Sequence, residues 1–179
     1  LMTEPRVILV DENDNQTGTA GKMEAHREAL LHRAVSVFIV NSSGEWILQR
    51  RALDKYHSKG LWTNTCCTHP YPGETNSEAA ERRLKEEMGI ECNLIELFSF
   101  IYHEKLENNL AENEYDHVFY GVSDQTPLIN AEEVEEWEAV AFDDLHEDIV
   151  QNPSDYTYWF KKIYEKVNQK ITALQEDKV

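Results

Sequence analysis

The sequence has little of what marks a disulfide-stabilised or membrane-spanning protein. Only three of its 179 residues are cysteine, Cys66, Cys67 and Cys92. The first two are adjacent, so a bridge between them would be strained, and we expect free thiols in a reducing, cytoplasmic environment. No run of about 18 apolar residues is present, which argues against a membrane span. The first five residues lack a basic segment followed by an apolar run, so we expect no secretion signal.

Basic residues are also scarce. Lysine and arginine number 17 against 34 aspartate and glutamate, giving a formal net charge of −17 and a pI near 4.7. This disfavours a broad docking surface for DNA or RNA. An anionic ligand must instead meet a local basic pocket or metal ions. Hydrophobic residues make up 41% of the chain, which is enough for the core of one soluble globular domain, either monomeric or homodimeric.

Short apolar and β-branched runs predict the strands. We expect them at residues 7–10, 34–40, 46–50, 61–68, 94–103, 114–122 and 137–142. A helix is predicted over 76–88, where Ala80, Leu84 and Met88 recur every four residues and Gly89 ends the pattern. An apolar stripe predicts an amphipathic C-terminal helix at about 155–175. The sequence therefore indicates an α+β fold, a mixed sheet packed between helices, in a single compact domain over residues 1–179. The acidic block 132–138 is expected to face solvent.

The segment from Thr63 to Pro70 is the densest in reactive side chains. If it is extended, Cys67 and His69 project from the same face and can share one cavity. A buried cysteine is more often a small core residue. A structural zinc site is disfavoured, because Cys66 and Cys67 lack the two-residue spacer of paired zinc ligands.

Three histidines and two glutamates together suggest a metal site. His26 and His32 are six residues apart, about 240° on a helix, so they can share a metal only if that segment is broken or not helical. Glu112 and Glu114 lie two apart and would share one face of a strand. Each of these residues alone has an ordinary structural explanation. With His69 they form a donor set that suits a five- or six-coordinate divalent metal better than a structural zinc.

The predicted helix 76–88 and the residues after the second strand gather the remaining charges. Arg83 and Glu87 are neighbours at four-residue spacing, which indicates either an ordinary surface ion pair or a Mg²⁺ site that binds a diphosphate with nearby arginines. Arg50, Arg51 and Lys55 form the other local basic cluster.

The segment Gly73 to Ile90 resembles a Nudix box. Seven positions fall on the pattern: Glu74, Arg82, Leu84, Glu86, Glu87, Gly89 and Ile90. Two positions depart from it, because Thr68 stands where the box has its first glycine and Arg83 where it has the glutamate after Arg82. Loss of that metal-binding glutamate argues against ordinary pyrophosphohydrolase chemistry.

The departures resemble one branch, the type I isopentenyl-diphosphate isomerases. The resemblance runs from about residue 26 to 160 and is carried by Leu31-His32-Arg33-Ala34, Arg50-Arg51-Ala52, Trp62 to Pro70, Glu112-Asn113-Glu114 and Tyr158-Trp159-Phe160. It implies a Nudix-type sheet, a core at about 26–160, and interconversion of isopentenyl and dimethylallyl diphosphate. The implied partner is a small allylic or homoallylic diphosphate, with no nucleic acid and no membrane.

The resemblance also implies roles for individual residues. The residues matching catalytic positions are Cys67, Glu114, Tyr102 and Trp159. Those matching a site for Mn²⁺, Zn²⁺ or Mg²⁺ are His26, His32, His69, Glu112 and Glu114, of which His26 is the less secure. Glu87 matches a residue that helps to hold Mg²⁺ against the diphosphate. Lys22, Arg51, Lys55 and Arg83 match the residues that bind the diphosphate.

Two other functions remain open from the sequence. One is a Nudix hydrolase of a nucleoside diphosphate derivative, against which Arg83 argues. The other is a metal-binding or regulatory module without activity, against which the intact set Cys67, His69, Glu112 and Glu114 argues.

Overall fold

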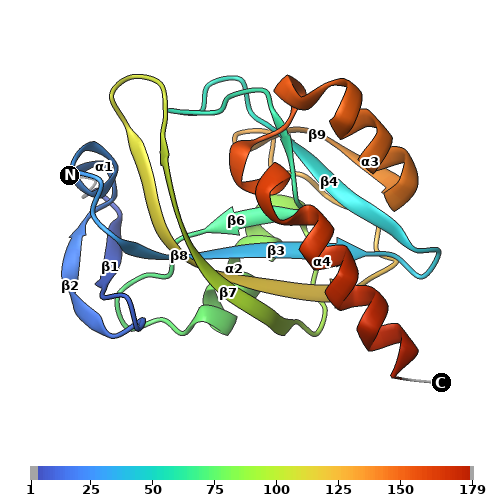
Figure 1. Ribbon diagram of the computed structural model, residues 1–179, viewed down its shortest axis with the longest axis horizontal. Helices are drawn as coiled ribbons and strands as arrows, with labels where there is room; N and C mark the ends of the chain where they lie inside the picture. Colours follow the sequence, from blue (N-terminus) through green and yellow to red (C-terminus); the bar gives the residue numbers. More distant parts are fainter. Residues whose placement is uncertain (1–3, 178–179) are drawn as a thin grey trace.

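The structure, a computed structural model, describes residues 4–177, so part of the segment examined for a secretion signal lies outside it. The strands are β1 (Arg6–Val10), β2 (Gln16–Gly21), β3 (His32–Val40), β4 (Glu45–Arg51), β5 (Trp62–Thr63), β6 (Cys66–Thr68), β7 (Ile95–Lys105), β8 (Ala111–Val122) and β9 (Val134–Ala141) (Figure 1). The helices are α1 (Lys22–Arg27), α2 (Asn76–Met88), α3 (Phe142–Gln151) and α4 (Tyr158–Glu176), with a 3-10 turn at Pro153–Asp155.

Strand β3 is the centre of the mixed sheet. β8 runs parallel to it in continuous register, from His32 opposite Glu114 to Val40 opposite Val122. Along its other edge β3 pairs in turn with β1, β6 and β4, all antiparallel. β7 extends the sheet beyond β8, and β9 extends it beyond β4. Side chains from β6 and β8 therefore meet across β3.

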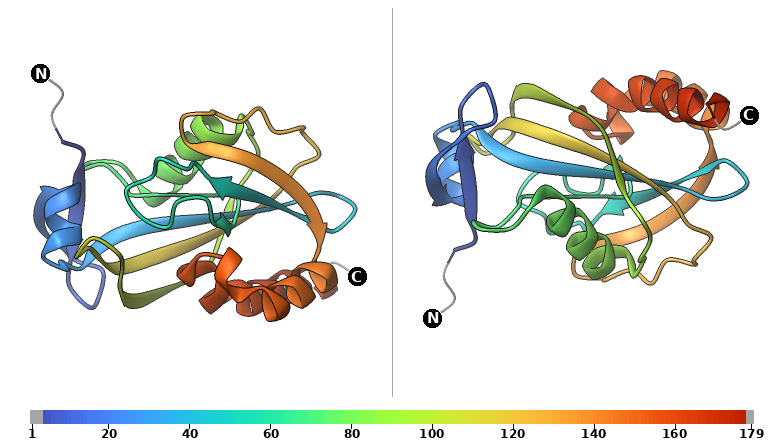
Figure 2. Two further views of the ribbon diagram at one scale, coloured as in Figure 1. Left: turned by 90° about the horizontal axis from the view of Figure 1, so that it is seen from above. Right: turned by 90° about the horizontal axis from the view of Figure 1, so that it is seen from below.

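Helices cover both faces of this sheet, with α2 on one side and α3 and α4 on the other (Figure 2). Leu84 and Met88 of α2 pack against Val37 and Ile39 of β3. The apolar stripe of α4 packs against the opposite face, where Phe38 of β3 stacks on the helix at Phe160. Because successive strand side chains point to opposite faces, almost all of β3 is buried. The predicted Nudix-type mixed sheet between helices is confirmed.

Helix α2 has the bounds that the sequence predicts, because both of its ends are specified locally. Thr75 and Glu78 form a reciprocal capping box at its start. At its end Gly89 adopts φ +65°, the left-handed conformation that a glycine accepts without strain. Only residues 69–75 join β6 to α2, so the helix lies beside this strand.

Several elements differ from the predicted ones. β7 and β8 are longer than expected, and the expected extended segment 61–68 is interrupted between β5 and β6. α4 begins at Tyr158 rather than near residue 155. The predicted strand 137–142 ends one residue early, because Phe142 begins α3 and packs on Trp46. α1, β2 and α3 were not anticipated, although Leu145 and Ile149 of α3 carry the four-residue spacing of a buried helical face.

The three cysteines are free, as expected, in the part of the chain that the structure describes. No helix between residues 4 and 177 combines the length and the apolar character needed to cross a membrane.

Candidate active site

A cavity of about 240 Å³ opens on the sheet and collects most of the predicted site residues. Eleven of them line it: Lys22, Arg51, Lys55, Cys67, His69, Arg83, Glu87, Tyr102, Glu112, Glu114 and Trp159. His26 and His32 are fully buried beside it. The convergence follows from strand geometry, because residues two apart on β3, β6 and β8 point to one face.

One end of the cavity, which we call the histidine end, consists of His26, His32, His69, Glu112 and Glu114. One potential ligand atom from each residue lies within 4.8 Å of all the others, an arrangement that can hold a metal ion. His26 lies in α1 and His32 begins β3. Between them Ala29 adopts φ +53°, which breaks the helix and turns the two imidazoles toward each other.

Buried ligand atoms at the histidine end point to a missing group. His26 Nε2, His32 Nε2 and Glu112 Oε2 are buried and have no hydrogen-bond partner within residues 4–177. Each lies at the cluster, with Glu112 Oε2 3.4 Å from His26 Nε2. Leaving a buried polar atom unpaired costs about 1–3 kcal/mol. Imidazole nitrogens and carboxylate oxygens are ligands for divalent metals, so the donor set fits a divalent ion.

Glu114 connects the histidine end to the rest of the cavity. It accepts hydrogen bonds from Tyr102 Oη at 2.6 Å and His69 Nε2 at 2.7 Å, and it lies 3.3 Å from His32 Nε2. Burial alone would raise the pKa of Glu114. The neighbouring imidazoles of His32 and His69 outweigh it and hold that pKa well below its usual range. Glu114 is thus a carboxylate shared between the metal cluster and the open cavity.

Cys67 reaches the same cavity from the other edge of β3. It pairs with Ser36 in the β3–β6 ladder, whereas Glu114 pairs with His32 in the β3–β8 ladder. Burial raises the pKa of Cys67 to about 12, so the thiol is protonated at neutral pH. The thiol and the carboxylate therefore approach a bound molecule from two sides of one strand.

Trp159 lines the cavity beside Cys67, and Asn64 lies behind both residues. Asn64 is fully buried, and its amide nitrogen donates to the carbonyls of Val37 and Cys66 and lies 3.3 Å from Cys67 Sγ. Its amide oxygen accepts from Trp159 Nε1 at 3.3 Å. One buried amide thus fixes both the thiol and the indole.

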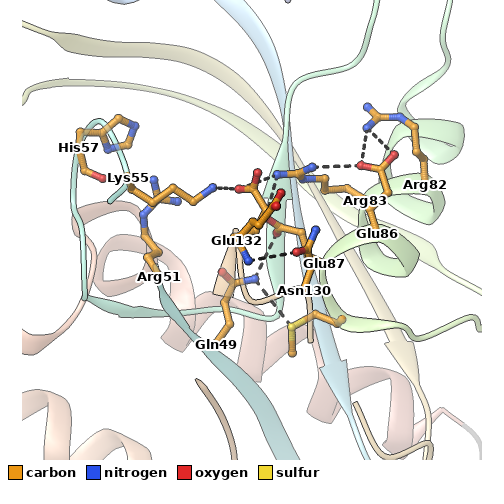
Figure 3. A network of polar contacts seen from close by, with 12 residues as sticks. Gln49, Arg51, Lys55, His57, Arg82, Arg83, Glu86, Glu87, Asn130 and Glu132 are labelled. Atoms are coloured by element: carbon orange, nitrogen blue, oxygen red, sulfur yellow. Dashed lines mark hydrogen bonds and ion pairs between the residues drawn. The ribbon is translucent and has the colours of Figure 1, made fainter. Parts of the chain in front are cut away.

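The opposite end of the cavity, which we call the basic end, consists of Lys22, Arg51, Lys55 and Arg83, with the carboxylates Glu87 and Glu133. Figure 3 shows Arg51 and Lys55 on one side of this network and Arg83 on the other. The burial of Lys22, reinforced by the charges of Lys55 and Arg83, lowers its pKa. Four cations in a protein of net charge −17 indicate an anionic ligand.

Carboxylates already neutralise part of the basic end. Arg83 lies 2.9 Å from Glu87 and 3.0 Å from Glu133, and Lys55 also pairs with Glu133. Burial raises the pKa of Glu87, partly opposed by Arg83. Glu133 belongs to the block 132–138 that was expected to face solvent. That expectation is wrong at Glu133, which turns into the cavity just before β9.

Sequence reasoning missed four residues that belong to this site. They are Tyr56, His57, Asn64 and Glu133. Two of them, Asn64 and Glu133, lie in segments already singled out for other reasons, but a single polar residue in a loop or strand carries no sign of its distant partner. Their roles become visible only from contacts made across the fold.

The NUDIX domain family matches residues 30–160 of the chain. Isopentenyl-diphosphate Delta-isomerase 1 of Aromatoleum aromaticum is 49% identical over 175 residues, which cover 98% of this chain and 97% of that protein. Isopentenyl-diphosphate Delta-isomerase 2 of Photorhabdus laumondii is 52% identical over 157 residues, covering 88% and 89%. These likenesses extend over most of each chain.

Solved structures with the same fold are more distant. The protein DR0079 of Deinococcus radiodurans has a TM-score of 0.71 at 21% identity, covering 89% of this chain and 98% of that one. The MutT NUDIX hydrolase of Burkholderia pseudomallei has a TM-score of 0.62 at 19% identity, covering 76% and 98%. These solved structures show the fold, whereas the more similar isomerase sequences show the family within it. The chain belongs to the isopentenyl-diphosphate Delta-isomerase family and carries the NUDIX domain fold.

Proposed function

We propose that this protein interconverts isopentenyl diphosphate and dimethylallyl diphosphate. The observation that carries the proposal is the placement of Cys67 and Glu114 on opposite edges of β3, facing one buried cavity. Moving the double bond requires one proton to be added at one carbon and another to be removed elsewhere, through a tertiary carbocation-like state. Two acid–base groups that reach the substrate from different sides meet this need.

Each of the two residues has a state suited to proton transfer. Cys67 carries its proton at neutral pH, so it can donate one and take one back. Glu114 is held as a carboxylate beside the hydroxyl of Tyr102, which stabilises the charge and orients it. Which group donates first depends on the direction of the reaction.

Trp159, which lines the cavity, is proposed to stabilise the cationic state. The indole is buried and held by Asn64. An aromatic face attracts positive charge by roughly 2 kcal/mol or more when water is excluded. A dry pocket also keeps water from capturing the cation. Trp159 is therefore proposed to face the hydrocarbon end of the substrate.

The two ends of the cavity are proposed to hold two divalent ions. The residues of the histidine end would hold Mn²⁺, Zn²⁺ or Mg²⁺, and Glu87 would help to hold Mg²⁺ against the diphosphate. When bound, such ions supply positive charge that favours ionised Glu114 and neutralises the diphosphate. Lys22, Arg51, Lys55 and Arg83 are proposed to bind the diphosphate oxygens, Arg51 and Arg83 by forked hydrogen bonds.

We further propose that one domain carries this activity, with its core at about residues 26–160 and the C-terminal helix packed on it. Its partner is the small diphosphate and not a nucleic acid, and its free thiols favour a cytoplasmic location. The names of the relatives favour isomerisation over hydrolysis of a nucleoside diphosphate derivative. Arg83 in place of the box glutamate points the same way.

The test is isomerisation of isopentenyl diphosphate by the parent protein and by Cys67→Ala, with Mg²⁺ plus Mn²⁺ or with chelator. We expect metal-dependent product formation that Cys67→Ala reduces by about 10³-fold or more, because a proton-transfer group is lost. Cys66→Ala is the matched control, since Cys66 is fully buried toward α2 and should keep most of the activity.

Three outcomes would contradict parts of the proposal. Activity that survives in Cys67→Ala would overturn the role of the thiol. Activity that survives complete chelation would overturn the role of the metals. Release of phosphate from nucleoside diphosphate derivatives, without isomerisation, would favour the hydrolase hypothesis.

A further inference from the structure

His57 lies beside the histidine end without being one of its five clustered residues. It is placed by the loop between β4 and β5, and only 2% of its surface is exposed. Its Nε2 lies 2.9 Å from Glu112 Oε1, and both side chains are buried. This contact limits the orientations that the Glu112 carboxylate can adopt.

The carboxylate of Glu112 fixes the tautomer of His57. An ionised carboxylate only accepts, so Nε2 carries the hydrogen and donates it to Glu112 Oε1. In the neutral ring Nδ1 then accepts from the hydroxyl of Ser58, whose oxygen lies 3.0 Å away. The imidazole therefore presents an N–H to the carboxylate.

Because of this hydrogen bond, the two carboxylate oxygens of Glu112 have different environments. Oε1 is occupied by His57, whereas Oε2 is one of the buried atoms that find no hydrogen-bond partner among residues 4–177. Oε2 faces His26 Nε2, which is equally unpaired. One oxygen is thus anchored, and the other is held free toward the centre of the cluster.

The loop that carries His57 is held in place from several directions. The backbone N–H of Ser58 donates to Glu107 at 2.8 Å. Arg51 donates to the carbonyl of His57 at 3.2 Å, and Figure 3 shows the two residues near each other. The ring of His57 also meets the face of Trp159 edge-on, with centroids 6.0 Å apart. His57 therefore has little freedom to turn away from Glu112.

We propose that His57 is a positioning residue that orients Glu112 for the divalent metal of the histidine end. The Nε2 hydrogen of His57 is donated to Glu112 Oε1, so His57 acts through that carboxylate and is not itself a metal ligand. Groups that orient a metal ligand in this way typically change metal affinity by about 10- to 100-fold when they are removed. The inference rests on the proposed metal site.

The test compares two amide substitutions of His57 in chelator-treated full-length protein. A glutamine places its amide nitrogen near the position of Nε2 and can still donate to Glu112, whereas an asparagine places it near Nδ1 and cannot reach. Mn²⁺ alone is titrated calorimetrically in the absence of diphosphate. We expect His57→Asn to weaken binding by about 10- to 100-fold and His57→Gln to bind within about threefold of the parent.

Controls separate this role from a structural one and from failure of the metal site. His103→Asn removes an exposed imidazole of β7 and should leave the affinity unchanged. A structural role would lower Tm equally with and without Mn²⁺, whereas a positioning role reduces the rise in Tm that Mn²⁺ produces. Equal affinities of His57→Asn and His57→Gln would overturn the role of His57, and a parent that binds no Mn²⁺ would overturn the metal site as well.

If His57→Asn does not fold, Ser58→Ala decides instead. It removes the hydroxyl that hydrogen-bonds Nδ1 and so helps to hold the ring toward Glu112, and the Mn²⁺ affinity should fall by severalfold. An unchanged affinity in that variant would count against the proposed orientation of Glu112.

Discussion

The two ends of the cavity are built in opposite ways. At the histidine end, His26 Nε2, His32 Nε2 and Glu112 Oε2 are buried without partners in the described chain, 4–177. At the basic end, Arg83 is already paired with Glu87 and Glu133. The first end offers unpaired ligand atoms that fit a divalent ion, and the second is partly neutralised by its own carboxylates. Ligand binding should therefore complete one end and rearrange the pairs of the other.

The largest effect should follow from a change at the histidine end. Glu114→Gln removes a carboxylate that accepts from His69 and Tyr102 and that is proposed to bind the metal and to transfer a proton. We expect kcat to fall by roughly 10³-fold, with weaker Mn²⁺ binding and little change in KM. Steady-state kinetics and calorimetry measure both.

Glu136→Gln, on the exposed face of β9, is the control for Glu114→Gln and should leave both quantities unchanged. A Glu114→Gln protein that keeps its kcat would contradict the proposed role of Glu114 in proton transfer. Circular dichroism verifies that the variant is folded.

A smaller effect, of opposite sign, is expected at the basic end. Glu133→Gln removes a carboxylate that pairs with both Lys55 and Arg83 and so frees cations for an incoming anion. We expect inorganic pyrophosphate to bind about fivefold more tightly without Mg²⁺, equivalent to about 1 kcal/mol. Calorimetry measures this, with Glu135→Gln, another exposed residue of β9, as the control. Weaker binding would mean that Glu133 positions the cations instead of competing for them.

The smallest effect concerns the rim of the basic end, where Glu74 binds Arg82 through two hydrogen bonds of 2.7 and 3.0 Å. Burial opposes ionisation of Glu74, but Arg82 and the backbone N–H of Tyr71 outweigh it and lower its pKa below the usual 4.5. The stabilisation is therefore present above pH 4.5 and is lost as the pH falls through the folded-state pKa.

We expect Glu74→Gln to lower the free energy of unfolding by about 0.5–1 kcal/mol at neutral pH and by progressively less in acid. Urea denaturation at several pH values measures this, and Glu81→Gln, exposed on α2 next to Arg82, should show no such trend. A constant difference at all pH values would contradict an ionic origin.

The elements specified by neighbouring residues could be predicted from the sequence. Helix α2 is the clearest case, because its capping box and Gly89 lie within the segment itself. The apolar stripe of α4 also predicted that helix, and the observed helix differs mainly in beginning at Tyr158 rather than near residue 155. By contrast, α1 has six residues and no side-chain cap, so nothing local marks it.

The candidate site divides in the same way. Cys67 and His69, or Glu112 and Glu114, are two apart on extended chain, so strand geometry predicts each pair. The meeting of His26 and His32 depends on a left-handed Ala29, a conformation that alanine does not favour. His57 and Glu112 are far apart in sequence, and their contact follows only from the folded chain.

The pairing of β3 with β8 has a consequence for how the molecule folds. Every pair in this ladder, from His32–Glu114 to Val40–Val122, joins residues 82 positions apart. Closing so long a loop costs chain entropy before the contacts between the strands can compensate for it. Parallel pairing of distant strands is therefore slow. The thiol edge of β3 can form from residues up to Thr68, whereas the carboxylate edge must wait for β8 to be synthesised. During translation the cavity therefore acquires its two walls at different times, and a nascent chain that stops before residue 111 contains only one of them.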